Sequence, residues 1–365
     1  MKTTFPEKAK KFFTSWEFVL LLILFAEIVI FATKNPKFLM PRVLFGSLND
    51  IISICIISLF VTFVMITGGI DIQAGSIVGL SSIVLGVAWQ DGGMNIWAAV
   101  ALAVVVAGVC GALSGYFVAY CGVQPMVVTL GGSFLFTGVA LLVSNLSATE
   151  SYKGISGFPD SFLQLSKFKL FGVIPCQVII FLVLAVIAYV LLNKTKYGRM
   201  VFLIGVNKDA AEFSGINTRL ITMTTYILSG ISAAIAGIIL TSYIGTAKSD
   251  IGVTFTLPII TAVVLGGTLS TGGKGSVVGT ALAAVVIGVL KFGLPLCFKV
   301  PQQYLDIPVG LLLLVVVIGR SLLTNPKVVA ALHPKDKNSI LMECSIKIKT
   351  AVLKRYKQRL YAADA

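Results

Sequence analysis

Long apolar stretches follow one another along most of this chain, separated by short polar segments. Windows of about 20 apolar residues, the length that a helix needs to cross ~30 Å of hydrocarbon, give these candidates: 16–32, 49–67, 74–90, 95–120, 126–144, 171–193, 221–243, 254–270, 277–296 and 307–324. With 57% hydrophobic and 12% charged residues and a mean hydropathy of +0.97, the chain is far more apolar than a soluble domain. The sequence therefore predicts an all-α, polytopic membrane protein with about ten transmembrane helices.

Two glycine-rich regions interrupt this pattern. Residues 68–79 read GGIDIQAGSIVG inside the apolar stretch 51–89, and residues 266–275 read GGTLSTGGKG between the eighth and ninth windows. Irregular backbone at membrane depth is tolerated only where protein or water surrounds it. We therefore expect broken or re-entrant segments at both breaks. The pentapeptide GSIVG at 75–79 recurs as GSVVG at 275–279, which indicates that the two breaks face one another near a central path.

The first break supplies the candidates for a translocation path, namely Gly68, Gly69, Asp71, Gln73 and Ser76. Gly69 is expected to take a backbone conformation that other residues resist. An ionised Asp in hydrocarbon costs roughly 2.5 to 3.5 kcal/mol on insertion scales, so Asp71 needs partners. It either caps backbone N–H groups at the break or contacts a substrate.

Basic residues predict the topology. Most of the 29 lysines and arginines lie in the N-terminal segment, in the loop 194–220 and in the tail from Arg320 onward. This pattern places both termini in the cytoplasm, although Lys34, Lys37 and Arg42 lie in the first outside loop. We expect a cytoplasmic segment 1–15, a membrane domain 16–324 and a basic tail 325–365, which forms either an interfacial helix or a disordered segment. The net charge of +14 indicates affinity for anionic lipid, not for nucleic acid.

The chain offers little material for catalysis or for binding a metal ion or a nucleotide. It has one histidine, His333, and its six cysteines include no CxxC pair. Residues 266–276 are not a phosphate-binding loop, because Thr268 replaces the first glycine of the motif and Gly275 replaces its Ser or Thr. The sequence predicts a chain with no cofactor, metal or catalytic site of its own; if ATP drives it, a separate chain binds the ATP and magnesium.

A short helix is predicted in the loop 194–220. Asn207 is a helix-start residue, Lys208 to Phe213 are mostly helix formers, and Ser214–Gly215 ends the segment. Ala210, Ala211 and Phe213 would form an apolar contact with a polar rim. The helix is either a knob that fits a partner's groove or a solvated connector.

Several of these segments resemble one family. GGIDIQAGS is similar to the GGIDLSVGS signature of ribose-type ABC sugar-importer permeases, and GVNKDAAEFSGI, LPIITAVVLGG and GGKGSVVGT continue the similarity over about residues 16–324. Within the family, YKGISGFP, VFLIG and SYIGTAKSDIG most resemble permeases that import autoinducer-2. The signature departs at Ile72, Gln73 and Ala74, where the family usually has Leu, Ser and Val.

The resemblance implies a function and a set of partners. It implies a permease in the bacterial inner membrane with a second permease subunit, a cytoplasmic ABC ATPase that contacts residues 207–215, and a periplasmic substrate-binding protein. Lys153 and Lys248, in outside loops, would dock that binding protein or are simply solvated. Import of ribose or a related sugar, an ion-coupled transporter that uses Glu27 or Asp71, and a membrane scaffold remain as alternatives.

Overall fold

The computed structural model describes residues 16–149, 153–170, 172 and 174–324, so the predictions for 1–15 and 325–365 lie outside the described residues. By its internal contacts the chain separates into two units, residues 1–313 and 314–365. The described part of the second unit, 314–324, is helical.

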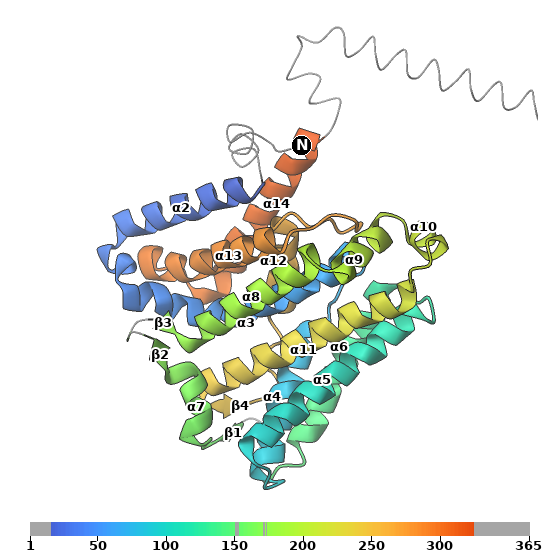
Figure 1. Ribbon diagram of the computed structural model, residues 1–365. Coiled ribbons are helices and arrows are strands. Elements are labelled where there is room, and N and C mark those ends of the chain that lie inside the picture. The colour runs from blue at the N-terminus through green and yellow to red at the C-terminus, as the bar shows by residue number, and fades with distance from the viewer. Residues whose placement is uncertain (1–15, 150–152, 171, 173, 325–365) are drawn as a thin grey trace, which may run out of the picture. The chain divides into compact units, whose positions relative to one another are not determined.

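The described residues are almost entirely helical (Figure 1). The α-helices are α2 (Trp16–Lys34), α3 (Pro41–Ile66), α4 (Ala74–Gln90), α5 (Ile96–Ala119), α6 (Pro125–Ser144), α7 (Asp160–Lys167), α8 (Cys176–Asn193), α9 (Lys196–Val206), α10 (Lys208–Phe213), α11 (Thr218–Ile244), α12 (Thr256–Leu265), α13 (Val277–Phe298) and α14 (Asp306–Thr324); the 3-10 turns are η1 (Pro36–Leu39) and η2 (Gln302–Tyr304). Side-chain caps begin several of them, at Asn95, Thr195, Asn207, Asn217 and Ser276.

Each predicted apolar window contains a helix. Among the described residues, six helices are long and apolar enough to cross a membrane, namely α2, α5, α6, α8, α11 and α13. Shorter apolar helices are residues 51–66 of α3, α4, α12 and residues 306–316 of α14. The windows 171–193 and 254–270 are longer than the helices they contain, because α8 begins only at Cys176 and α12 spans Thr256–Leu265, where the glycine-rich break follows. Gly267 has a φ of +97°, and a right-handed helix cannot continue through a residue in that conformation.

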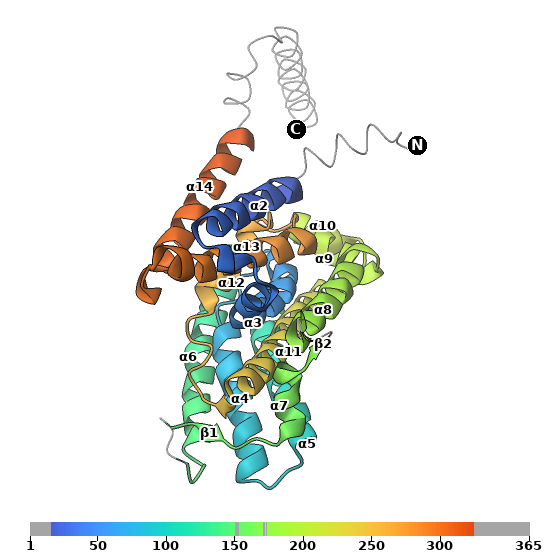
Figure 2. The same cartoon turned by 90° about the vertical axis from the view of Figure 1, so that its left-hand side faces the viewer.

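Helix α3 forms the centre of the first unit. Every residue from 51 to 66 is buried, and α3 contacts α8, α11, α12 and α13. On the other side of α11 lies α5, which packs closely on it (Figure 1). The approach is close because glycines carry no side chain into the interface: a Cβ on Gly115 would lie 2.9 Å from the Met223 carbonyl oxygen, and one on Gly230 would meet the carbonyl of Ala107. Helices α4 and α6 run side by side, and α4 also contacts α5 (Figure 2).

Short strands connect loops that are distant in sequence. β1 (Ile155–Ser156) pairs antiparallel with β4 (Thr246–Ala247), so that Ile155 lies opposite Ala247. β2 (Lys169–Leu170) pairs with β3 (Ile174–Pro175) in the same sense. The sequence predicts neither ladder, because two-residue strands have no detectable periodicity.

Candidate functional site

The first break separates α3 from α4 over residues 67–73. The turn is made by Gly68, whose φ of +85° is left-handed, and not by Gly69 as expected. At Gly69 the backbone conformation does not require glycine, but there is no room for a side chain. A Cβ at Gly69 would lie against the Tyr226 hydroxyl and 3.0 Å from Val64 Cγ1.

Asp71 ties this break to α11. Its Oδ1 accepts the Gln73 N–H at 3.1 Å, and the Ser229 hydroxyl donates to its Oδ2 at 2.6 Å. The side chain is buried, with 1% exposure. One of its two partners is thus a backbone N–H of the break, as the capping role requires.

Gln73 is also enclosed by protein. Its Oε1 accepts a hydrogen bond from Ser114 Oγ at 2.6 Å, and a Cβ on Gly132 would lie against that oxygen. The side chain is 0% exposed. In this conformation Gln73 fills the space between α4, α5 and α6 and does not line an open path.

Ser76 lies at an accessible edge. It is half-buried, and its hydroxyl accepts a hydrogen bond from Thr137 Oγ1 of α6 at 3.0 Å. Thr137 is exposed. Of the predicted path residues, Gly68 and Ser76 are thus accessible, whereas Gly69, Asp71 and Gln73 are buried. Thr137 was missed because α6 reads as a plain apolar helix.

The second break, residues 266–276, lies against the first. The Gly273 N–H donates to the Ile66 carbonyl at 2.9 Å, and a Cβ on Gly68 would lie 3.7 Å from the carbonyl of Thr271. The expectation that the two breaks face one another is confirmed by these contacts.

A third irregular segment, 248–255, includes most of a predicted outside loop, but its packing on α4 was not predicted. Its Gly252 meets Gly75 backbone to backbone, since a Cβ on Gly75 would lie 2.5 Å from the Gly252 carbonyl oxygen. One turn further along α4, Gly79 faces the backbone of Ser249. The Thr256 hydroxyl then donates to the Ile72 carbonyl at 3.1 Å. The spacing of Gly75 and Gly79 on one helix face was the available signal.

A cavity of about 220 Å³ lies between the first break and the loop 194–220. Its lining includes Gly68, Gly69, Gln124, Lys208 and Tyr226. It brings residues predicted for the path and for ATPase coupling to one place.

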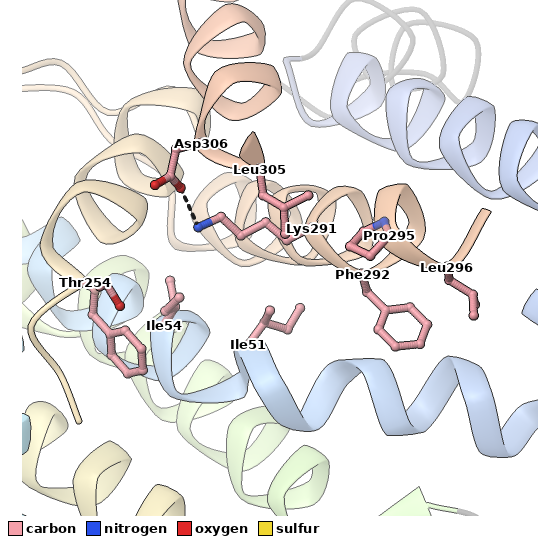
Figure 3. A pocket seen from close by; sticks show the side chains of 10 residues that line it. Ile51, Ile54, Thr254, Lys291, Phe292, Pro295, Leu296, Leu305 and Asp306 are labelled. Carbon is pink, nitrogen blue, oxygen red and sulfur yellow. Dashed lines mark hydrogen bonds and ion pairs between the residues drawn. The ribbon is translucent and has the colours of Figure 1, made fainter. Parts of the chain in front are cut away.

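A larger cavity of about 710 Å³ lies elsewhere, between α3, α13 and the start of α14 (Figure 3). Most of the residues that line it have apolar side chains, and at one end Lys291 and Asp306 form an ion pair of 2.9 Å. Because the Asp306 side chain is 85% exposed, this pair contributes at most ~1 kcal/mol. None of the predicted path residues lines this cavity.

The predicted short helix is present as α10. Asn207 caps it by accepting the Ala210 N–H at 2.9 Å, and the chain leaves it at Ser214 through Gly215, whose φ is +79°. Phe213 is 93% exposed and Ala210 is exposed, but Ala211 is buried within the chain itself. A partner can therefore contact Ala210 and Phe213, not Ala211.

Helix α9, which precedes α10, was not predicted. It adds two exposed apolar side chains to the same segment, Leu203 at 52% and Val206 at 71%. Because contact with an ATPase is the role predicted for this segment, we call the exposed residues Leu203, Val206, Ala210 and Phe213 the coupling surface.

The two lysines proposed for docking come from adjacent loops. The β1–β4 ladder joins the loops that carry them, and a Cβ on Gly154 would lie 2.7 Å from Lys248 Cγ. Lys153 is exposed and Lys248 is half-buried. In the part of the chain that the structure describes, no cluster of three or more His, Cys, Asp and Glu residues could hold a metal ion.

Membrane-length apolar helices and two glycine-rich breaks that contact one another are typical of a multi-pass membrane transport protein. Residues 43–317 match the family described as branched-chain amino acid transport system / permease component. The chain belongs to this family and is a transport subunit.

The chain is similar to several proteins called autoinducer 2 import system permease protein LsrD. The LsrD of Photorhabdus laumondii is 42% identical over 84% of this chain and 91% of the relative. The LsrD of Salmonella typhimurium is 42% identical over 84% and 92%, and that of Yersinia pseudotuberculosis is 41% identical over 84% and 91%. No solved structure matches the chain.

Proposed function

We propose that this chain is the membrane permease subunit of an ABC importer that moves autoinducer-2 into the cytoplasm. The observation that carries the proposal is the similarity to LsrD proteins over about nine tenths of their length, since a match of that extent includes the whole helical framework and not one motif alone.

The chemistry of the accessible edge fits a neutral, hydroxyl-rich furanose-like ligand. Such a ligand needs hydrogen-bonding groups and no fixed charge. Ser76 and Thr137 supply hydroxyls at the accessible edge, while the carboxylate of Asp71 is already engaged by Gln73 and Ser229. Gly68, Gly69, Asp71 and Gln73 would shape the path from behind.

The protein would act in the bacterial inner membrane as one part of a complex. We propose about ten crossings with both termini in the cytoplasm, since each apolar window contains a helix. Its partners would be a second, related permease subunit, a periplasmic binding protein that docks near Lys153 and Lys248, and a cytoplasmic ATPase that holds ATP and magnesium. The ATPase would contact the segment Asn207–Gly215 and the coupling surface.

Two alternatives differ in what they require of the chain. A permease for ribose or a related monosaccharide would use the same architecture. An ion-coupled transporter would need an intramembrane carboxylate free to bind a cation. Asp71 already accepts two hydrogen bonds, so its carboxylate is not free. Glu27 is the other candidate, and it is a buried side chain on the apolar helix α2.

Uptake by reconstituted vesicles tests the proposal. Vesicles containing this chain, its permease partner, the ATPase and the binding protein should accumulate labelled autoinducer-2 only when ATP is present. Excess ribose should not compete. Equal uptake of ribose would contradict autoinducer-2 as the ligand and favour a sugar permease. Uptake driven by an ion gradient without ATP would contradict an ABC importer and favour an ion-coupled transporter.

Phe213 provides a test of ATPase coupling. We expect Phe213→Asp to insert normally, because a side chain that is 93% exposed makes few contacts within the chain. A charge at a buried interface costs several kcal/mol, so the variant should no longer co-purify with the ATPase or transport. Leu146→Asp is the matched control. Leu146 is 75% exposed and follows the C-terminal end of α6, whereas the 220 Å³ cavity is lined by Pro125 at the N-terminal end of that helix. If Phe213→Asp keeps its ATPase and its uptake, α10 is only a connector.

A further inference from the structure

The carbonyl of Ile66, the last residue of α3, is a meeting point of three segments. Gly273 of the second break donates its N–H to this oxygen at 2.9 Å. A Cβ on Gly272 would lie 3.0 Å from the same oxygen and 2.9 Å from the Gly68 nitrogen. Both breaks therefore approach each other backbone to backbone.

Gly205, near the end of α9, closes this arrangement from the cytoplasmic loop. A Cβ on Gly205 would lie against the Ile66 carbonyl and the Gly273 nitrogen, and 3.0 Å from Gly273 Cα. No side chain larger than hydrogen fits there without moving backbone. We call the residues Gly68, Gly205, Gly272 and Gly273 around the Ile66 carbonyl the glycine seam.

Helix α9 contacts both α11 and α3. Tyr197 at its start shares a hydrogen bond with Thr224 Oγ1 of α11 at 3.0 Å, and its ring lies 6.4 Å from that of Phe63 in α3. At its other end, α9 runs directly into Asn207 and α10.

We propose that Gly205 is a positioning residue that links the α9–α10 segment to both breaks at once, so that a movement of the coupling surface changes the two breaks together. This inference rests on the proposed function, in which the ATPase acts on α10. A side chain at Gly205 would separate α9 from the Ile66 carbonyl and disturb the hydrogen bond from Gly273. Phe213, the most exposed residue of the coupling surface at 93%, lies on α10 and would keep its exposure.

Gly205→Ala in the complete complex tests the link. We expect the ATPase to co-purify and to hydrolyse ATP at its basal rate, while stimulation by the loaded binding protein and uptake both fall by about tenfold or more. A defect in folding alone would lower assembly and all activities together. The matched control is Gly131→Ala on α6, where an added Cβ would meet nothing within 4 Å; it should transport normally. Unchanged uptake and stimulation in Gly205→Ala would overturn the link.

Hydrogen–deuterium exchange of the unmodified complex keeps the inference testable if Gly205→Ala does not accumulate. Adding a non-hydrolysable ATP analogue should change exchange in peptides that cover 196–206 and 266–276 together, because the Gly273 amide is bonded within the seam. A change in 196–206 without one in 266–276 would overturn the link. Loss of ATPase binding in Phe213→Asp but not in Gly205→Ala separates this inference from the proposed docking of the ATPase.

Discussion

Replacing Asp71 with alanine is expected to lower the free energy of unfolding by on the order of 3 kcal/mol and to abolish uptake. The change leaves the Gln73 N–H and the Ser229 hydroxyl buried without their acceptor, and each unsatisfied buried group costs about 1–3 kcal/mol. The connection between the first break and α11 is lost at the same time. Thermal unfolding of the purified chain in detergent, followed with the uptake assay, measures both effects.

Asp71→Asn separates a structural role from a contact with substrate. The Asn side-chain oxygen can still accept the Gln73 N–H, and its amide can donate to the Ser229 oxygen, so most of the stability should remain. We expect Asp71→Asn to transport at a reduced but measurable rate. Normal stability with complete loss of uptake would contradict the structural role and assign the carboxylate to the transported molecule.

The sequence predicted the helical framework because a lipid environment leaves the chain few options. Backbone groups in hydrocarbon must be satisfied within the segment, so apolar length alone indicates where helices lie. Helix α10 was predictable for a local reason: Asn207 and Gly215 act on the residues next to them.

The arrangement of the site could not be predicted in the same way. The burial of Gln73 depends on Ser114 and Gly132, which come from two other helices. The contacts of Gly205 with the two breaks join backbones that are far apart in sequence, and a glycine leaves no hydrophobic pattern that would reveal its neighbour. The burial of Ala211 beside the exposed Phe213 likewise depends on how α10 lies on the rest of the chain.

The irregular segment 248–255 is held against α4 by backbone contacts of the same kind and leads to the first break. It has no regular helix of its own against α4 and depends on Gly75 and Gly79 for its close approach. Where it ends, the Thr256 hydroxyl is bonded to the Ile72 carbonyl of the first break. A displacement of the segment should therefore reach the break directly.

We expect Gly79→Val to abolish uptake while the protein remains in the membrane. A Cβ at Gly79 would lie against the Ser249 carbonyl oxygen and 2.8 Å from its carbon, so the segment 248–255 must move away from α4. Overpacking of this kind typically costs ~1–3 kcal/mol, which spares the fold but displaces the bond between Thr256 and Ile72. Gly138→Val is the matched control, because a Cβ at Gly138 would meet nothing within 4 Å. Uptake and elution of the complex in size-exclusion chromatography are compared for both variants. Transport at the unmodified rate by Gly79→Val would show that this segment is not connected to the break.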